Sequence, residues 1–139
     1  MTPLPESVLQ WKSLAEKYAT IYPVLEANEI LAIIWTESTG HPNSQNPADP
    51  SWGLMGVTML IARAFGQVTE YEQLFNPDTN VKCGSGFLAH LKTAYAHRFP
   101  NWMFGYNEGE TNLLKGYKDQ GYWDSFNIHL AALNAINAI

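Results

Sequence analysis

The sequence predicts an all-α protein with at most one small β-hairpin. Apolar residues recur every three or four positions through most of the 139 residues, which is the spacing of one face of an α-helix. No segment shows a convincing alternation of apolar and polar residues, the pattern typical of a half-buried strand. A length of 139 residues and an apolar fraction of 46% suit one globular domain, which we place at residues 1–139.

The first half of the chain is expected to form two helices and a loop. The inner face of the first helix is predicted at Val8, Trp11, Ala15, Tyr18 and Ile21 or Tyr22. Pro5 fits its first turn and Pro23 ends it. The second helix is expected from about Leu25 to Thr39, with Gly40 as its stop. Three prolines make residues 41–51 a loop and argue against much sheet there.

The middle of the chain is predicted to hold a medium helix, a short turn and a long helix. Residues 54–66 have an apolar face and end at a glycine, and residues 71–75 suit a short helix or turn. Asn76 is a suitable cap for the long helix, with Pro77 in its first position and Asp78 at the positive end of its dipole. Pro100 is the expected stop. Gly84 and Gly86 cost helix stability, which predicts close approach of another helix.

The last third is expected to be helical as well. We predict short helices at about residues 102–106 and 109–118. A final helix has its expected inner face at Ile128, Ala131 or Ala132, Ala135 or Ile136, and Ile139. Cys83 lies in the apolar pattern of the long helix, so a buried, unreactive thiol is expected.

The most informative residue is Glu37, which ends an apolar run that begins at Ile30. On a period of 3.6 residues, Glu37 shares one stripe with Ile30, Ile33 and Ile34. Burial disfavours the ionised form of a carboxyl group and raises its pKa, so such a group can donate a proton near neutral pH. Glu37 is therefore a candidate general acid. The alternative is a capped or salt-bridged glutamate without a catalytic role.

Composition excludes several other classes of protein. The net charge is −5, and the sequence contains no run of clustered lysine and arginine residues, which argues against nucleic-acid binding. No pair of histidines, or of histidine with cysteine, has the spacing of a zinc site. The longest apolar run is too short to cross a bilayer, and no signal peptide is visible at the N-terminus. We therefore expect no cofactor, no metal and no stable membrane insertion.

Four short motifs, in order, resemble those of the lytic transglycosylases of the soluble-lytic-transglycosylase type. The motifs are Glu37-Ser38, Gly53-Leu54-Met55, Asn80-Val81 with Gly84 and Phe87-Leu88, and Tyr106-Asn107-Glu108-Gly109. The loop residue Asn46 also falls where that family has a residue near the sugar. The chain departs from the family pattern at Gly56, where the family has Gln, and at Gly105, where it has Ala.

This resemblance implies a lysozyme-like helical domain with a substrate cleft that binds peptidoglycan glycan strands. Family members cleave the MurNAc–GlcNAc β-1,4 bond without water and leave 1,6-anhydro ends. Glu37 would act first as acid and then as base, and Tyr106 would assist at the acetamido group. The implied substrate contacts are Ser38, Asn46, Trp52, Gly53, Leu54, Met55 and Asn107.

Two other functions remain open from the sequence. A hydrolytic muramidase of the same fold would use water, and Asp49 is the only loop carboxylate available as a second catalytic group. A non-catalytic glycan-binding or structural module is the other reading, because Gly56 removes a side chain that family members direct at substrate. We expect a monomer that acts at the bacterial cell wall, in the periplasm or delivered by a phage as a lysis or tail-associated enzyme.

Overall fold

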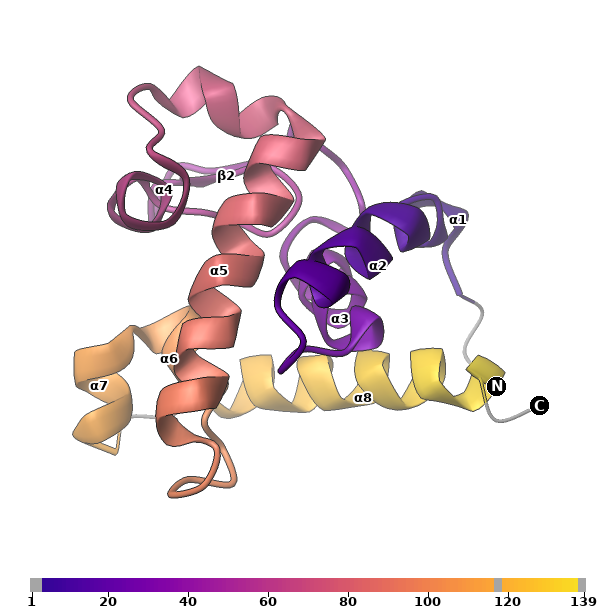
Figure 1. Cartoon of the computed structure of the whole chain (residues 1–139), viewed down its shortest axis with the longest axis vertical. Helices are drawn as coiled ribbons and strands as arrows, with labels where there is room; N and C mark the ends of the chain where they lie inside the picture. Colours follow the sequence, from indigo (N-terminus) through magenta and orange to yellow (C-terminus); the bar gives the residue numbers. More distant parts are fainter. Residues whose placement is uncertain (1–3, 117–118, 138–139) are drawn as a thin grey trace.

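The computed structural model describes residues 4–116 and 119–137 and is mostly helical (Figure 1). The helices are α1 (Glu6–Leu9), α2 (Lys12–Ile21), α3 (Ala27–Ser38), α4 (Met59–Gly66), the 3₁₀ helix η1 (Tyr71–Phe75), α5 (Pro77–Tyr95), α6 (Phe104–Glu108), α7 (Glu110–Leu114) and α8 (Gln120–Asn137). A two-stranded antiparallel hairpin, β1 (Gln45–Asn46) and β2 (Ser51–Trp52), is the only sheet in this described part. The predicted all-α class with one small hairpin is confirmed.

The first expected helix is two helices, α1 and α2, so that prediction was wrong in its continuity. The chain turns at Trp11, whose indole N–H donates to the Gly40 carbonyl oxygen at 2.8 Å. Ser7 in α1 donates to the Thr39 carbonyl oxygen, also at 2.8 Å. Any Cβ on Gly40 would collide with the backbone of Ser7, so α1 lies directly against the end of α3. The break in the helix is what lets both side chains reach that end.

Helix α3 carries the apolar run and ends as expected near Gly40. Residues 30–35 are all buried, and Thr39 adopts a left-handed conformation at the C-cap with a φ of 52°. At the other end, Glu26 and Glu29 form a reciprocal capping box. Glu29 also pairs with Lys92 of α5 at 2.7 Å, which ties the start of α3 to the long helix.

The third helix is shorter than the sequence indicates. It begins at Met59, after Thr58 caps it through the Ile61 N–H, and not near Leu54. Gly53 and Gly56 both have positive φ, so the segment between them is a turn and cannot be helical. Leu54, Met55 and Val57 are nevertheless fully buried, which explains why they mimic a helix face.

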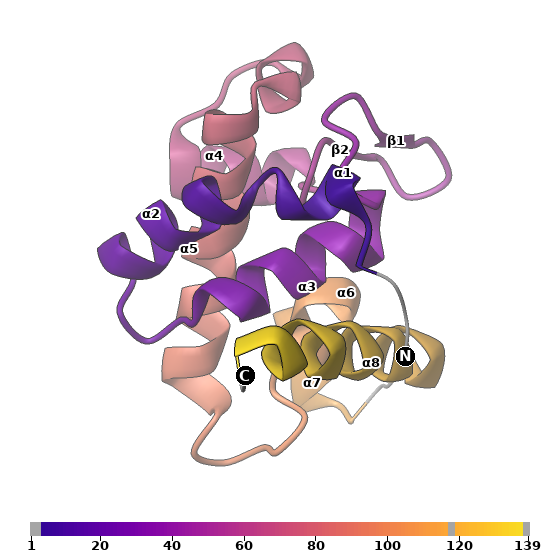
Figure 2. The same ribbon diagram turned by 90° about the vertical axis from the view of Figure 1, so that its right-hand side faces the viewer.

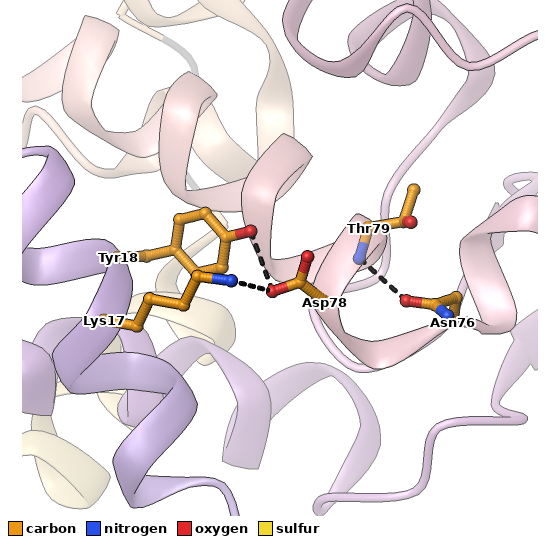
Figure 3. A network of polar contacts seen from close by, with 5 residues as sticks. All are labelled: Lys17, Tyr18, Asn76, Asp78 and Thr79. Atoms are coloured by element: carbon orange, nitrogen blue, oxygen red, sulfur yellow. Dashed lines mark hydrogen bonds and ion pairs between the residues drawn. The ribbon is translucent and has the colours of Figure 1, made fainter.

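Helix α5 starts where the Asn-Pro-Asp sequence predicts and ends at Tyr95, before Pro100. The Asn76 side chain accepts the Thr79 N–H, while Asp78 turns outward to α2 (Figure 3). There Asp78 accepts hydrogen bonds from Lys17 at 2.6 Å and from Tyr18 at 2.9 Å. This network attaches α2 to the beginning of the long helix.

Close approach at both glycines of α5 is confirmed. A Cβ on Gly84 would lie 2.6 Å from the Met55 sulfur and 2.8 Å from the Tyr106 hydroxyl, and one on Gly86 would press on Phe65. One of these contacts is to the turn before α4, not to a helix. Cys83 is buried, as expected.

The last helix, α8, runs antiparallel along α3 (Figure 2) and begins at Gln120, well before the predicted inner face at Ile128. Ile128 is in fact exposed. The expected position Ile139 and the end of the helix predicted at 109–118 lie outside the described residues. No helix of the described chain has the length and apolar character to cross a bilayer.

Candidate active site around Glu37

Glu37 lies in the last turn of α3, with its two carboxyl oxygens in different surroundings. Its Oε2 accepts a hydrogen bond from the Tyr122 hydroxyl of α8 at 2.8 Å. Its Oε1 lies over the backbone of Gly56, where a Cβ would come within 2.5 Å of that oxygen. Because Tyr122 donates to Oε2, the carboxylic acid proton belongs on Oε1.

Burial raises the pKa of Glu37 from its ordinary value of 4.5 to about 7. The hydrogen bond from Tyr122 opposes this effect by stabilising the carboxylate, and the negative charge of Asp49 adds to it. Glu37 thus holds a proton near neutral pH and can also accept one, as the apolar stripe in the sequence indicates.

Ser38 and Tyr106 hold the turn that faces the acid. The Ser38 hydroxyl donates to the Leu54 carbonyl oxygen at 2.7 Å and also lies 3.0 Å from that of Ile34. The Tyr106 hydroxyl of α6 donates to the Met55 carbonyl oxygen at 2.7 Å. The proton of each hydroxyl is therefore engaged with backbone, and the oxygen of Tyr106 retains lone pairs for another donor.

Asn80 of α5 organises the same turn from the opposite side. Its fully buried amide accepts the Met55 N–H at 2.8 Å and donates to the carbonyl oxygens of Trp52 at 2.7 Å and Leu74 at 2.9 Å. Gly53 is needed here because any Cβ would overlap the Asn80 amide, and because its φ is +78°. The turn before α4 is thus fixed from both sides.

A groove of about 330 Å³ lies on the far side of Tyr106 from Glu37, and Glu37 is not among its lining residues. Its walls come from α4, α5 and the junction of α6 with α7, with Leu60, Ile61, Phe65, Phe87, His90 and residues 108–112 as the lining. Phe87 also packs on the Tyr106 ring, with 5.6 Å between ring centroids. Contacts therefore run from the groove through Tyr106 and the Met55–Gly56 turn to Glu37.

The remaining predicted residues differ in their surroundings, and the structure gives Asn46 no contact with Glu37 or Tyr106. Asn46 is exposed in β1, and the Trp52 ring stacks on Tyr71 of η1 with 5.1 Å between centroids. Asn107 is partly buried in α6 and precedes Glu108, which lines the groove instead of facing bulk water alone. Gly53, Leu54 and Met55 are buried, so they contribute backbone and packing to the site.

Tyr122 and Asn80 are the two functional candidates that sequence reasoning did not place in the site. Tyr122 forms an apolar stripe on α8 with Phe126, His129 and Leu133, but the sequence does not say which helix that stripe meets. Asn80 stood in a recognised motif, and its polarity within the otherwise apolar pattern of α5 was the available signal.

No group of three or more histidine, cysteine, aspartate or glutamate side chains is placed to hold a metal ion, as far as the chain is described.

Two comparisons with known proteins were informative in different ways. The comparison with curated proteins gives no match. The family model described as the transglycosylase SLT domain matches residues 13–128, a span that contains Glu37, the turn before α4, Asn80, Tyr106 and Tyr122. With most of its length matched, this chain belongs to the transglycosylase SLT domain family.

Proposed function

We propose that this chain is a peptidoglycan lytic transglycosylase that uses Glu37 as its single acid and base. The observation that carries the proposal is the buried carboxyl group itself, with its pKa raised to about 7 and its Oε2 bonded by Tyr122. Membership of a transglycosylase family and a groove that reaches Tyr106 through Phe87 support the same conclusion.

In the proposed reaction, Glu37 Oε1 gives its proton to the GlcNAc O4 oxygen as the bond from O4 to the MurNAc C1 carbon breaks. The acetamido oxygen of the same MurNAc stabilises the positive charge at C1. The Glu37 carboxylate then takes the proton of the MurNAc C6 hydroxyl, and O6 bonds to C1. The acid is regenerated and no water is consumed.

The groove supplies binding for the glycan. Phe87 and Leu60 offer apolar surface to the CH faces of sugar rings, and Glu108 and Asn112 offer hydrogen-bond partners at its edge. The Tyr106 hydroxyl, which already donates to Met55, would accept a hydrogen bond from the acetamido N–H. In this role Tyr106 orients the acetamido group through its oxygen.

A Glu37→Gln variant tests the assignment because it keeps the shape of the side chain and removes the transferable proton. We expect the rate of turbidity loss of bacterial cell walls to fall by about 10²–10⁴-fold, the usual contribution of a general acid. A Glu29→Gln variant is the control, since Glu29 is also a partly buried glutamate of α3 but pairs with Lys92. An unchanged rate in Glu37→Gln would leave a non-catalytic glycan-binding module as the better description.

Hydrolysis is the second candidate, because the charge of Asp49 acts on Glu37 from the hairpin loop. A second carboxylate near the acid is what a water-using glycosidase requires. Mass spectrometry of the digest separates the two reactions: anhydro ends are lighter than reducing ends by one water. Anhydro ends that persist in an Asp49→Asn variant support the transglycosylase, whereas reducing ends that disappear with Asp49 support the muramidase.

The proposed substrate places the activity at the bacterial cell wall. We also propose that the enzyme works as a monomer, in the periplasm or delivered by a phage for lysis or as a tail-associated enzyme.

A further inference from the structure

Helix α8 supplies Tyr122 to the acid, so its register on α3 decides where that hydroxyl lies. Three polar contacts join the two helices in antiparallel order: Tyr122 with Glu37, His129 with Thr36, and Asn134 with Asn28. Tyr122 and His129 are seven residues apart, so they lie on one face of α8, two turns from each other.

Tyr122 belongs to the first turn of α8, where helix ends fray. The adjacent Trp123 packs on Phe104 of α6, with 5.0 Å between centroids, and this contact ties the turn to α6 and not to α3. Phe126 and Leu133 bury apolar surface. Apolar contacts are non-directional and tolerate a small rotation or slide of the helix, whereas a hydrogen bond does not.

His129 is the directional contact nearest to the acid along α8. Its ring stacks on Trp35 with 4.1 Å between centroids and 8° between planes, and its Nδ1 lies 2.9 Å from Thr36 Oγ1. The Thr36 hydroxyl has one proton, which it gives to the Ala32 carbonyl oxygen at 2.7 Å. With that proton engaged, the geometry assigns the hydrogen to His129 Nδ1, which donates it to Thr36 Oγ1.

We propose that His129 is a positioning residue for the reaction: its bond to Thr36 and its stacking on Trp35 set the register of α8, and through it the bond from Tyr122 to Glu37. The expected effect of His129 on the reaction rate rests on the proposed function. The dependence of the Tyr122–Glu37 hydrogen bond on His129 is independent of that function.

Two variants separate the parts of the contact. His129→Phe keeps a ring against Trp35 and loses the donor, and His129→Asn keeps a donor near the position of Nδ1 and loses most of the ring. Asn134→Ala is the control, because it removes the Asn28–Asn134 bond between the same helices. All three are first checked for cooperative thermal unfolding by circular dichroism.

The first measurement is the pKa of Glu37. It is determined by ¹³C NMR of the Glu37 carboxyl carbon during a pH titration, which requires no enzymatic activity. The Tyr122 bond lowers this pKa, so loss of the bond raises it. We expect a rise in His129→Phe, a smaller change in His129→Asn and none in Asn134→Ala. A Tyr122→Phe background must abolish the effect of His129→Phe, because a residue that acts through Tyr122 has nothing left to position.

The second measurement is the kinetics on soluble glycan fragments. We expect kcat to fall about fivefold in His129→Phe, the equivalent of one ordinary hydrogen bond, with KM unchanged. An unshifted Glu37 pKa in a folded His129→Phe protein, or an equal shift with and without Tyr122, overturns the proposal. Absence of activity in the unmodified protein would refute the proposed function but leave the NMR result decisive for His129.

Discussion

The two oxygens of the Glu37 carboxyl group have different neighbours, because Tyr122 bonds Oε2 whereas Oε1 lies against the backbone of Gly56. An apolar helix face that runs into a single carboxylate made this acid predictable from the sequence. Its partner was not predictable, since Tyr122 is 85 residues away and local patterns do not pair distant helices. The close approach of Oε1 to Gly56 requires a residue without a Cβ, and the positive φ of this glycine is visible only in the structure.

A Tyr122→Phe substitution tests the effect of the Tyr122 bond. The phenyl ring keeps the packing, and loss of the hydrogen bond should raise the pKa of Glu37 above about 7. The pH above which wall lysis declines should then move upward, while the maximal rate falls about fivefold. The pH–rate profile measures both changes.

Tyr18→Phe is the matched control for this experiment, because it removes a tyrosine–carboxylate bond of 2.9 Å between α2 and α5. An identical profile for Tyr122→Phe and the unmodified protein would contradict the role of Tyr122 at the acid.

Among the elements, the turn between β2 and α4 depends most on a single side chain. Asn80 satisfies one N–H and two carbonyl groups of other segments from a fully buried position. Sequence patterns identified α5 and its Asn76 cap correctly because capping is local. They extended α4 too far because buried Leu54 and Val57 fit a helical period by coincidence, while positive φ at Gly53 and Gly56 excludes a helix there.

An Asn80→Ala variant should lower the free energy of unfolding by about 3 kcal/mol, because it leaves buried polar groups without partners. Urea denaturation measures this difference. The control, Asn76→Ala, removes one exposed capping bond of the same helix and should cost about 1 kcal/mol. Equal losses for the two variants would show that Asn80 does not hold the turn.

For the whole molecule, burial of Glu37 makes the free energy of unfolding depend on pH. The pKa of Glu37 is higher when folded, about 7 against an ordinary 4.5, so the folded state binds the proton more tightly. The contribution of Glu37 to the free energy of unfolding is therefore fully present below pH 4.5, and it is lost as the pH rises to about 7. Asp78 behaves oppositely, since its bond with Lys17 lowers its pKa, and its contribution is lost in acid.

We therefore expect Glu37→Gln and the unmodified protein to differ in stability only above pH 4.5. The variant should become the more stable protein by at most about 3 kcal/mol once the pH passes 7. Asp78→Asn should instead remove part of the loss of stability below about pH 4. Urea denaturation at a series of pH values checks both, and a gap between Glu37→Gln and the parent protein that stays constant from pH 4 to 8 would contradict the burial of Glu37.

Ser7 of α1 and Trp11, which precedes α2, contact Thr39 and Gly40 at the end of α3. Both residues precede residue 13, where the family match starts, yet they donate hydrogen bonds to the C-terminal end of α3, the helix that carries Glu37. A polypeptide trimmed to the matched span would preserve all four motifs and still leave that terminus open to solvent. The span that matches the family model is thus shorter than the segment whose residues contact the end of α3.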